Sequence, residues 1–123
     1  MTDAVLLVED ELFIALDLQG TIEDTGFRVV GPCGTIAEAR AAIDAAGGAF
    51  AAAVLDVRLA DGTVFPIADT LHAAGVPLIF HSGHADENEL WRRYPAAMVC
   101  PKPSAPADLA SALRRSTRGS RAA

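Results

Sequence analysis

The sequence is poor in cysteine, in long apolar runs and in lysine, and the first two scarcities each exclude a class of protein. Cys33 and Cys100 are far apart and form no CxxC pair, so a disulfide framework or a zinc ribbon is unsupported. No apolar run approaches the ~20 residues that a transmembrane helix needs. The N-terminus lacks the basic start and the apolar stretch of a signal peptide. We therefore expect a cytoplasmic protein with no membrane partner.

The charge balance is acidic, with a formal net charge of -6 at pH 7. Nucleic acid and anionic membranes repel such a chain, so neither is an expected partner. The exception is a basic cluster near the C-terminus, formed by Arg114, Arg115, Arg118 and Arg121. We expect residues 114–123 to form a solvated, disordered tail, and a docking site is the alternative.

Lysine is the scarcest charged residue, because nine of the ten basic residues are arginine and only Lys102 is lysine. Lysine is a compact point charge, whereas arginine is a wide planar fork. Lys102, placed between two prolines, is therefore a candidate for a confined site. Chance in an arginine-rich composition is the alternative, and nothing in Lys102 alone decides between them.

The 123 residues, 51% of them hydrophobic, suit one domain with a packed core. Short apolar runs, typical of buried strands, alternate with segments of helical period. The predicted strands are 4–8, 28–30, 51–55, 76–80 and 96–100. The predicted helices are 12–25, 35–46, 64–74, 86–94 and about 104–113. This alternation predicts an α/β domain over residues 1–113, with a parallel sheet and right-handed crossovers.

Polar residues follow four of the predicted strands. Glu9 and Asp10 follow the first strand, Asp56 the third, Ser82 the fourth and Lys102 the fifth. Asp10 and Asp56 are 46 positions apart, as are Asp56 and Lys102. Because sites in open parallel sheets form at the carboxyl ends of the strands, we expect all five side chains at one edge.

Three carboxylates at one edge repel one another, and a hard divalent cation such as Mg²⁺ relieves that repulsion. A carboxylate can also attack phosphorus to form an acyl phosphate, whose oxygens Lys102 and Ser82 are placed to bind. The alternative is that Glu9, Asp10 and Glu11 only cap the first helix. Asp56 resists that explanation, because a carboxylate that ends a buried strand is costly unless it is paired or liganded.

In their order and spacing these residues resemble the receiver domains of bacterial response regulators, over about residues 4–113. The resemblance implies a flavodoxin-like, doubly wound sheet of five parallel strands in the order 2-1-3-4-5, with five helices. Only about ten residues follow Leu113, so we expect a stand-alone receiver without an output domain.

The resemblance implies phosphorelay signalling in a two-component system. Asp56 would accept the phosphoryl group from a sensor histidine kinase or a histidine phosphotransfer protein. Glu9, Asp10, Asp56 and the main-chain carbonyl of Arg58 would hold Mg²⁺ or Mn²⁺. Ser82 and Lys102 would contact the phosphoryl oxygens. Such a protein is a conformational switch rather than an enzyme, although self-catalysed phosphorylation and dephosphorylation are compatible with it.

The sequence departs from the family pattern at three places. Ala60 stands where a proline is usual, and the loop that follows is short. Ser82-Gly83 replaces the more frequent Thr-Ala. Val99 replaces the aromatic residue that rotates on activation, so the output route must differ. We expect the readout surface, for an unknown downstream protein or a homodimer, over residues 86–94, 96–100 and 104–113.

Other interpretations compete with phosphorylation. A haloacid dehalogenase needs a second aspartate at position 58, where Arg58 stands, and a flavodoxin-like cofactor carrier would not place acidic residues in its first loop. The serious alternative is a pseudo-receiver, a phosphorylation-independent interaction module. Arg58 and His84 are candidates for setting the lifetime of the phosphoryl group. A zinc site at His81 and His84 would need further ligands, and Trp91 is either core or a partner surface.

Overall fold

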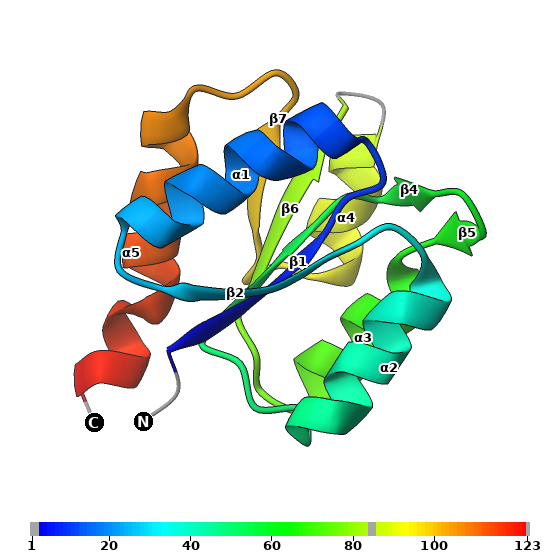
Figure 1. Cartoon of the computed structure of the whole chain (residues 1–123), viewed down its shortest axis with the longest axis horizontal. Coiled ribbons are helices and arrows are strands. Elements are labelled where there is room, and N and C mark those ends of the chain that lie inside the picture. Colours follow the sequence, from blue (N-terminus) through cyan, green and yellow to red (C-terminus); the bar gives the residue numbers. More distant parts are fainter. Residues whose placement is uncertain (1–2, 84–85, 123) are drawn as a thin grey trace.

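The computed structural model describes residues 3–83 and 86–122, and side chains as far as Thr117. Five parallel strands form one sheet in the order β2-β1-β3-β6-β7 (Figure 1). The strands are β1 (Ala4–Val8), β2 (Arg28–Cys33), β3 (Ala52–Leu55), β6 (Leu78–Ser82) and β7 (Met98–Pro101). This order confirms the doubly wound sheet that the resemblance implied.

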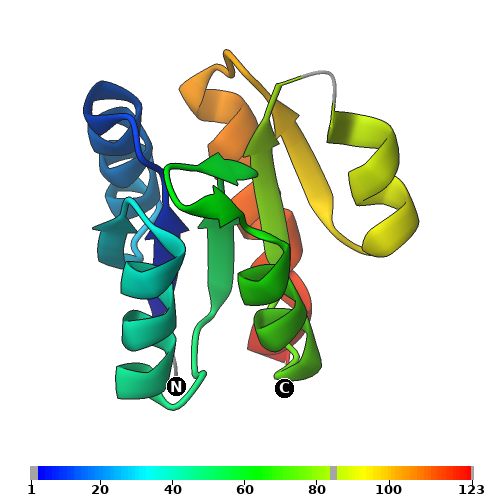
Figure 2. The ribbon, with the colours of Figure 1, turned by 90° about the vertical axis from the view of Figure 1, so that its right-hand side faces the viewer.

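Five helices of the described segments cover both faces of the sheet. They are α1 (Leu12–Asp24), α2 (Ile36–Ala46), α3 (Phe65–Ala73), α4 (Glu87–Arg93) and α5 (Pro106–Ala122). Helices α1 and α5 lie on one face, and α2, α3 and α4 lie on the other (Figure 1, Figure 2). No helix in the described part of the chain is both long and apolar enough to cross a bilayer.

The central strands are buried on both faces, which explains their unbroken apolar sequence. In β1, Val5 and Leu7 pack toward α1 and α5, whereas Leu6 and Val8 pack toward α2, α3 and α4. Strand β3 is equally buried along its whole length. Polar side chains can therefore enter these strands only at their ends, and that places the functional groups at one edge of the sheet.

A short hairpin that the sequence did not predict follows β3. Strands β4 (Arg58–Leu59) and β5 (Gly62–Thr63) pair antiparallel. The Asp61 carboxylate in the turn accepts backbone N–H groups of Ile36 and Ala37 at 2.8 and 3.3 Å, which ties the hairpin to the start of α2. Those bonds lower the pKa of Asp61 below its usual value. Strands of two residues carry no readable periodicity, so only the short loop was visible in the sequence.

Helix α1 leaves several large apolar side chains exposed. The apolar Leu12, Phe13 and Leu16 are exposed, and the buried residues of α1 are Ala15, Leu18 and Ile22. At 3.6 residues per turn, that buried stripe leaves Phe13 and Leu16 facing away from the sheet.

Helix α5 continues to Ala122, where the sequence favoured a loose basic tail after Leu113. Its added turn is packed, because Thr117 is buried and donates to the Leu113 carbonyl at 2.7 Å.

Candidate functional site

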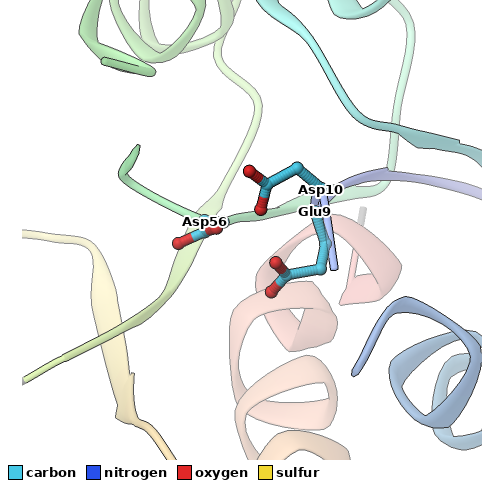
Figure 3. A group of neighbouring side chains, drawn as sticks. All are labelled: Glu9, Asp10 and Asp56. Carbon is cyan, nitrogen blue, oxygen red and sulfur yellow. The ribbon is translucent and has the colours of Figure 1, made fainter. Parts of the chain in front are cut away.

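Three carboxylates converge at the carboxyl ends of β1 and β3 (Figure 3). Glu9 and Asp10 follow β1, Asp56 follows β3, and one oxygen of each lies within 4.8 Å of the others. The Asp56 backbone N–H donates to the Val8 carbonyl at 2.8 Å, and this hydrogen bond keeps the ends of β1 and β3 side by side. Glu9 and Asp56 are buried whereas Asp10 is exposed, so the cluster opens to solvent on the Asp10 side.

Lys102 neutralises part of this charge. Its Nζ atom lies 3.1 Å from Glu9 Oε1 and 3.2 Å from Asp56 Oδ1. Burial alone would lower the pKa of Lys102, but the charges of Asp56 and Glu9 outweigh burial and raise it. The backbone N–H of Lys102 donates to the Ser82 carbonyl at 2.8 Å, and the Lys102–Pro103 peptide bond is cis. The lone lysine of the chain thus lies between two buried carboxylates.

The two buried carboxylates have opposite pKa shifts. Burial, followed by the charge of Glu9, raises the pKa of Asp56 to about 6, and Lys102 offsets this only in part. Burial also raises the pKa of Glu9, but contacts with His81, Asp56 and Lys102 outweigh it and lower the pKa to about 2. Glu9 therefore loses its proton more readily than Asp56, and the negative charge is less favourable on Asp56 than on Glu9.

Ser82 reaches the same edge at the end of β6, and it is buried. Its hydroxyl donates to the Gly83 carbonyl at 3.2 Å rather than to the carboxylates. A hydroxyl can rotate to serve another acceptor. Ser82 therefore lies at the edge of the sheet, and its hydroxyl is hydrogen-bonded to the neighbouring residue Gly83.

Arg58 contributes differently through its side chain and its backbone. Its guanidinium donates to Asp86 Oδ1 at 2.8 Å, which links the hairpin to the start of α4. Hydrogen-bonded and non-hydrogen-bonded pairs alternate along an antiparallel hairpin. The Val64 N–H donates to the Val57 carbonyl, so the next pair, Arg58 and Thr63, is a non-hydrogen-bonded pair. The Arg58 carbonyl is thus left out of the hairpin pairing.

The sequence offered His81 only as a candidate zinc ligand together with His84, and the structure gives it other contacts. Its side chain is 5% exposed, with Nε2 2.9 Å from Ser104 Oγ and Nδ1 3.8 Å from Glu9 Oε1. The available signal was its place as the first polar residue after the predicted apolar strand 76–80. His84 lies outside the described residues, so its predicted influence on the phosphoryl lifetime stays a prediction.

Comparisons with known proteins identify the domain. No protein-family profile matches the chain. It is 30% identical over 115 residues to the phyllosphere-induced regulator PhyR of Methylorubrum extorquens, covering 92% of this chain and 43% of that protein. It superposes on a response regulator receiver protein of Sinorhizobium medicae with a TM-score of 0.83 and 25% identity, over 95% of both chains. The non-phosphorylated HemR receiver domain of Leptospira biflexa gives 0.80 and 29%, over 94% of both.

The chain folds as a response regulator receiver domain and is similar to such domains in sequence. It spans less than half the length of the PhyR protein that it matches.

The aromatic residue that rotates on activation in other receivers is replaced here by Val99. This valine lies in β7 and is half-buried. The nearby aromatic pair is Phe80 and Tyr94, whose ring centroids lie 5.3 Å apart, and the Tyr94 hydroxyl donates to Asp69 at 2.6 Å. Trp91 on α4 is 48% exposed.

Proposed function

We propose that this receiver domain accepts a phosphoryl group on Asp56 with the help of Mg²⁺ or Mn²⁺. The observation that carries the proposal is the position of Asp56. It is buried at the end of β3, in one cluster with Glu9 and Asp10, and 3.2 Å from Lys102. Beside Asp56 there are thus carboxylates that can bind a cation and an ammonium group that can bind an anion.

The residues of the cluster fit a hard divalent cation. All three side chains offer carboxylate oxygens, the donors that Mg²⁺ prefers, and the exposed Asp10 leaves room for the waters that this ion keeps. Glu9 Oε1 is buried and has the Lys102 ammonium 3.1 Å away, so this carboxylate oxygen already faces positive charge. Glu9, Asp10, Asp56 and the Arg58 carbonyl would hold the ion, which would supply positive charge to the phosphoryl oxygens.

The phosphoryl donor is a phosphohistidine on a sensor kinase or a phosphotransfer protein. One Asp56 oxygen forms a bond to phosphorus while the phosphorus–nitrogen bond breaks. The electron pair of the broken bond stays with the imidazole, which takes up a proton. The Lys102 ammonium and the Ser82 hydroxyl each bind a phosphoryl oxygen, and Lys102 leaves Glu9 to do so.

Phosphorylation adds roughly -1.5 to -2 charge at the edge of the sheet, and the domain acts as a cytoplasmic switch rather than as an enzyme. We place the readout on the surface of α4, β7 and α5, for a downstream protein or a second copy of the chain. The half-exposed Trp91 of α4 supports that surface.

A pseudo-receiver is the second candidate. Two observations favour it: Val99 in place of an aromatic switch, and the compact hairpin after Asp56. Such a module would keep the fold and the partner surface without taking up phosphate.

Phosphoryl uptake separates the two candidates. We expect the wild-type protein, incubated with a small phosphodonor such as acetyl phosphate and with Mg²⁺, to gain the mass of one phosphoryl group. The gain should disappear in Asp56→Asn, which removes the nucleophile, and on chelation of the metal. Intact-protein mass spectrometry measures it, with Asp69→Asn as a matched control that keeps the gain. A wild-type protein that stays unmodified at every Mg²⁺ concentration would favour the pseudo-receiver.

A further inference from the structure

His81 connects the carboxylate cluster to the segment that follows β7. It lies near the end of β6, directly before Ser82, and its ring is almost completely buried. Nε2 lies 2.9 Å from the hydroxyl oxygen of Ser104, whereas Nδ1 faces Glu9 Oε1 at 3.8 Å. His81 Nδ1 is buried without a hydrogen-bond partner, whereas Glu9 Oε1 has the Lys102 ammonium 3.1 Å away. A buried ring nitrogen without a partner thus faces this carboxylate oxygen across a short gap.

The contacts assign the tautomer of the ring. A neutral imidazole has one N–H, and the Ser104 hydroxyl can either donate to Nε2 or accept from it. A lone pair on Nδ1 would face the buried carboxylate of Glu9 and be repelled. The favourable arrangement therefore has the Ser104 hydroxyl donating to Nε2 and the proton on Nδ1, directed at Glu9.

The contact between Glu9 Oε1 and Lys102 would be lost in the proposed reaction. Lys102 Nζ lies 3.1 Å from this oxygen, and the Glu9 side chain is 0% exposed. On the proposed function, a divalent cation bound at Glu9 would repel the Lys102 ammonium, and a phosphoryl oxygen on Asp56 would attract it away from Glu9. Water cannot reach the abandoned oxygen freely, which makes an unpaired acceptor costly there.

We propose that His81 is a positioning residue that takes over Glu9 Oε1 when Lys102 moves away. The inference rests on the proposed function of the site. A movement of less than about 1 Å brings Nδ1 to hydrogen-bonding distance while Nε2 keeps Ser104. The N–H donor then fixes the Glu9 carboxylate in the orientation that binds the metal. Partners of metal ligands of this kind typically change metal affinity by about 10- to 100-fold.

Three substitutions at position 81 test which nitrogen matters. His81→Leu removes both polar contacts, His81→Gln places an amide near Nε2, and His81→Asn places one near Nδ1. Calorimetric titration with Mg²⁺, without any phosphodonor, gives the dissociation constant. We expect a rise of about tenfold or more for His81→Leu and His81→Gln, and a value within about threefold of wild type for His81→Asn. The matched control, His72→Leu on the exposed side of α3, should leave the constant unchanged.

Other outcomes would overturn the inference. Wild-type affinity in both His81→Leu and His81→Gln would exclude a role through Glu9, and failure of His81→Asn to restore affinity would exclude Nδ1. A wild-type protein that binds no Mg²⁺ would overturn the proposed function as well, so the two failures are distinguishable. Thermal unfolding without Mg²⁺ monitors the fold, and the comparison of Gln with Asn decides the matter if the leucine variant does not fold.

Discussion

Asp56→Asn is expected to raise the free energy of unfolding of the metal-free protein at pH 7 by about 1 to 3 kcal/mol. Asp56 is buried and faces Glu9, and together these raise its pKa to about 6. At pH 7 the ionised carboxylate of Asp56 therefore destabilises the folded protein. Asparagine keeps the size of the side chain and removes the charge, so the phosphoacceptor should be a destabilising residue in the absence of metal.

The pH dependence of this difference follows from the sign of the shift. Because the folded-state pKa of Asp56 lies above its usual 3.8, the stabilising effect of the bound proton is complete below about pH 4. It is lost as the pH rises through about 6. Glu9, with its pKa lowered to about 2, behaves oppositely: its contribution is present above 4.5 and is lost as the pH falls toward 2.

Urea unfolding of the wild type and of Asp56→Asn at pH 4, 5, 6 and 7 measures the effect. The advantage of the variant should be small at pH 4 and should grow toward pH 7. Millimolar Mg²⁺ should stabilise the wild type more than the variant, because a ligand that binds only the folded protein stabilises it. An advantage that is the same at every pH, or a less stable variant at pH 7, would contradict the raised pKa.

Lys102→Met is expected to slow phosphorylation of Asp56 by roughly 100- to 1,000-fold at saturating Mg²⁺. Methionine fills part of the lysine volume but brings no charge, so one phosphoryl oxygen loses its ammonium partner in the transition state. The Nζ atom lies 3.2 Å from Asp56 Oδ1, which puts it within reach of a group bound there. Lys102→Arg should restore little, because a wide planar fork does not fit between the two carboxylates.

The initial rate of mass gain from a small phosphodonor measures this loss. Arg92→Met serves as a matched control, because Arg92 is an exposed residue in the last turn of α4, and its rate should equal that of the wild type. A rate for Lys102→Met within about threefold of wild type, in a protein with an intact circular dichroism spectrum, would remove Lys102 from the chemistry.

The sheet and its polar edge could be predicted because buried parallel strands appear in the sequence as apolar runs. The polar residues that follow these runs then mark the edge. Lys102 was indicated by composition as well, since it is the only lysine. Asp56, Lys102 and Glu9 accordingly meet where the strand ends predicted them.

Several features depend on contacts that no local pattern encodes. The hairpin of Arg58–Leu59 and Gly62–Thr63 is held by Asp61 against α2, which is distant in sequence. The contacts of His81 are with Glu9, which follows β1, and with Ser104, which follows β7. The exposure of Phe13 follows from which stripe of α1 faces the sheet, and the unbroken apolar run from Leu12 to Leu16 at the start of the helix hides that choice.

A crystal structure determined with Mn²⁺ and beryllium trifluoride, a stable phosphoryl analogue, tests the central claim most directly. We predict an anomalous manganese peak among Glu9, Asp10, Asp56 and the Arg58 carbonyl. The beryllium should be bonded to an Asp56 oxygen, and Lys102 Nζ should have moved from Glu9 to a fluoride. Manganese bound elsewhere, or an unmodified Asp56 with Lys102 still about 3.1 Å from Glu9, would contradict it.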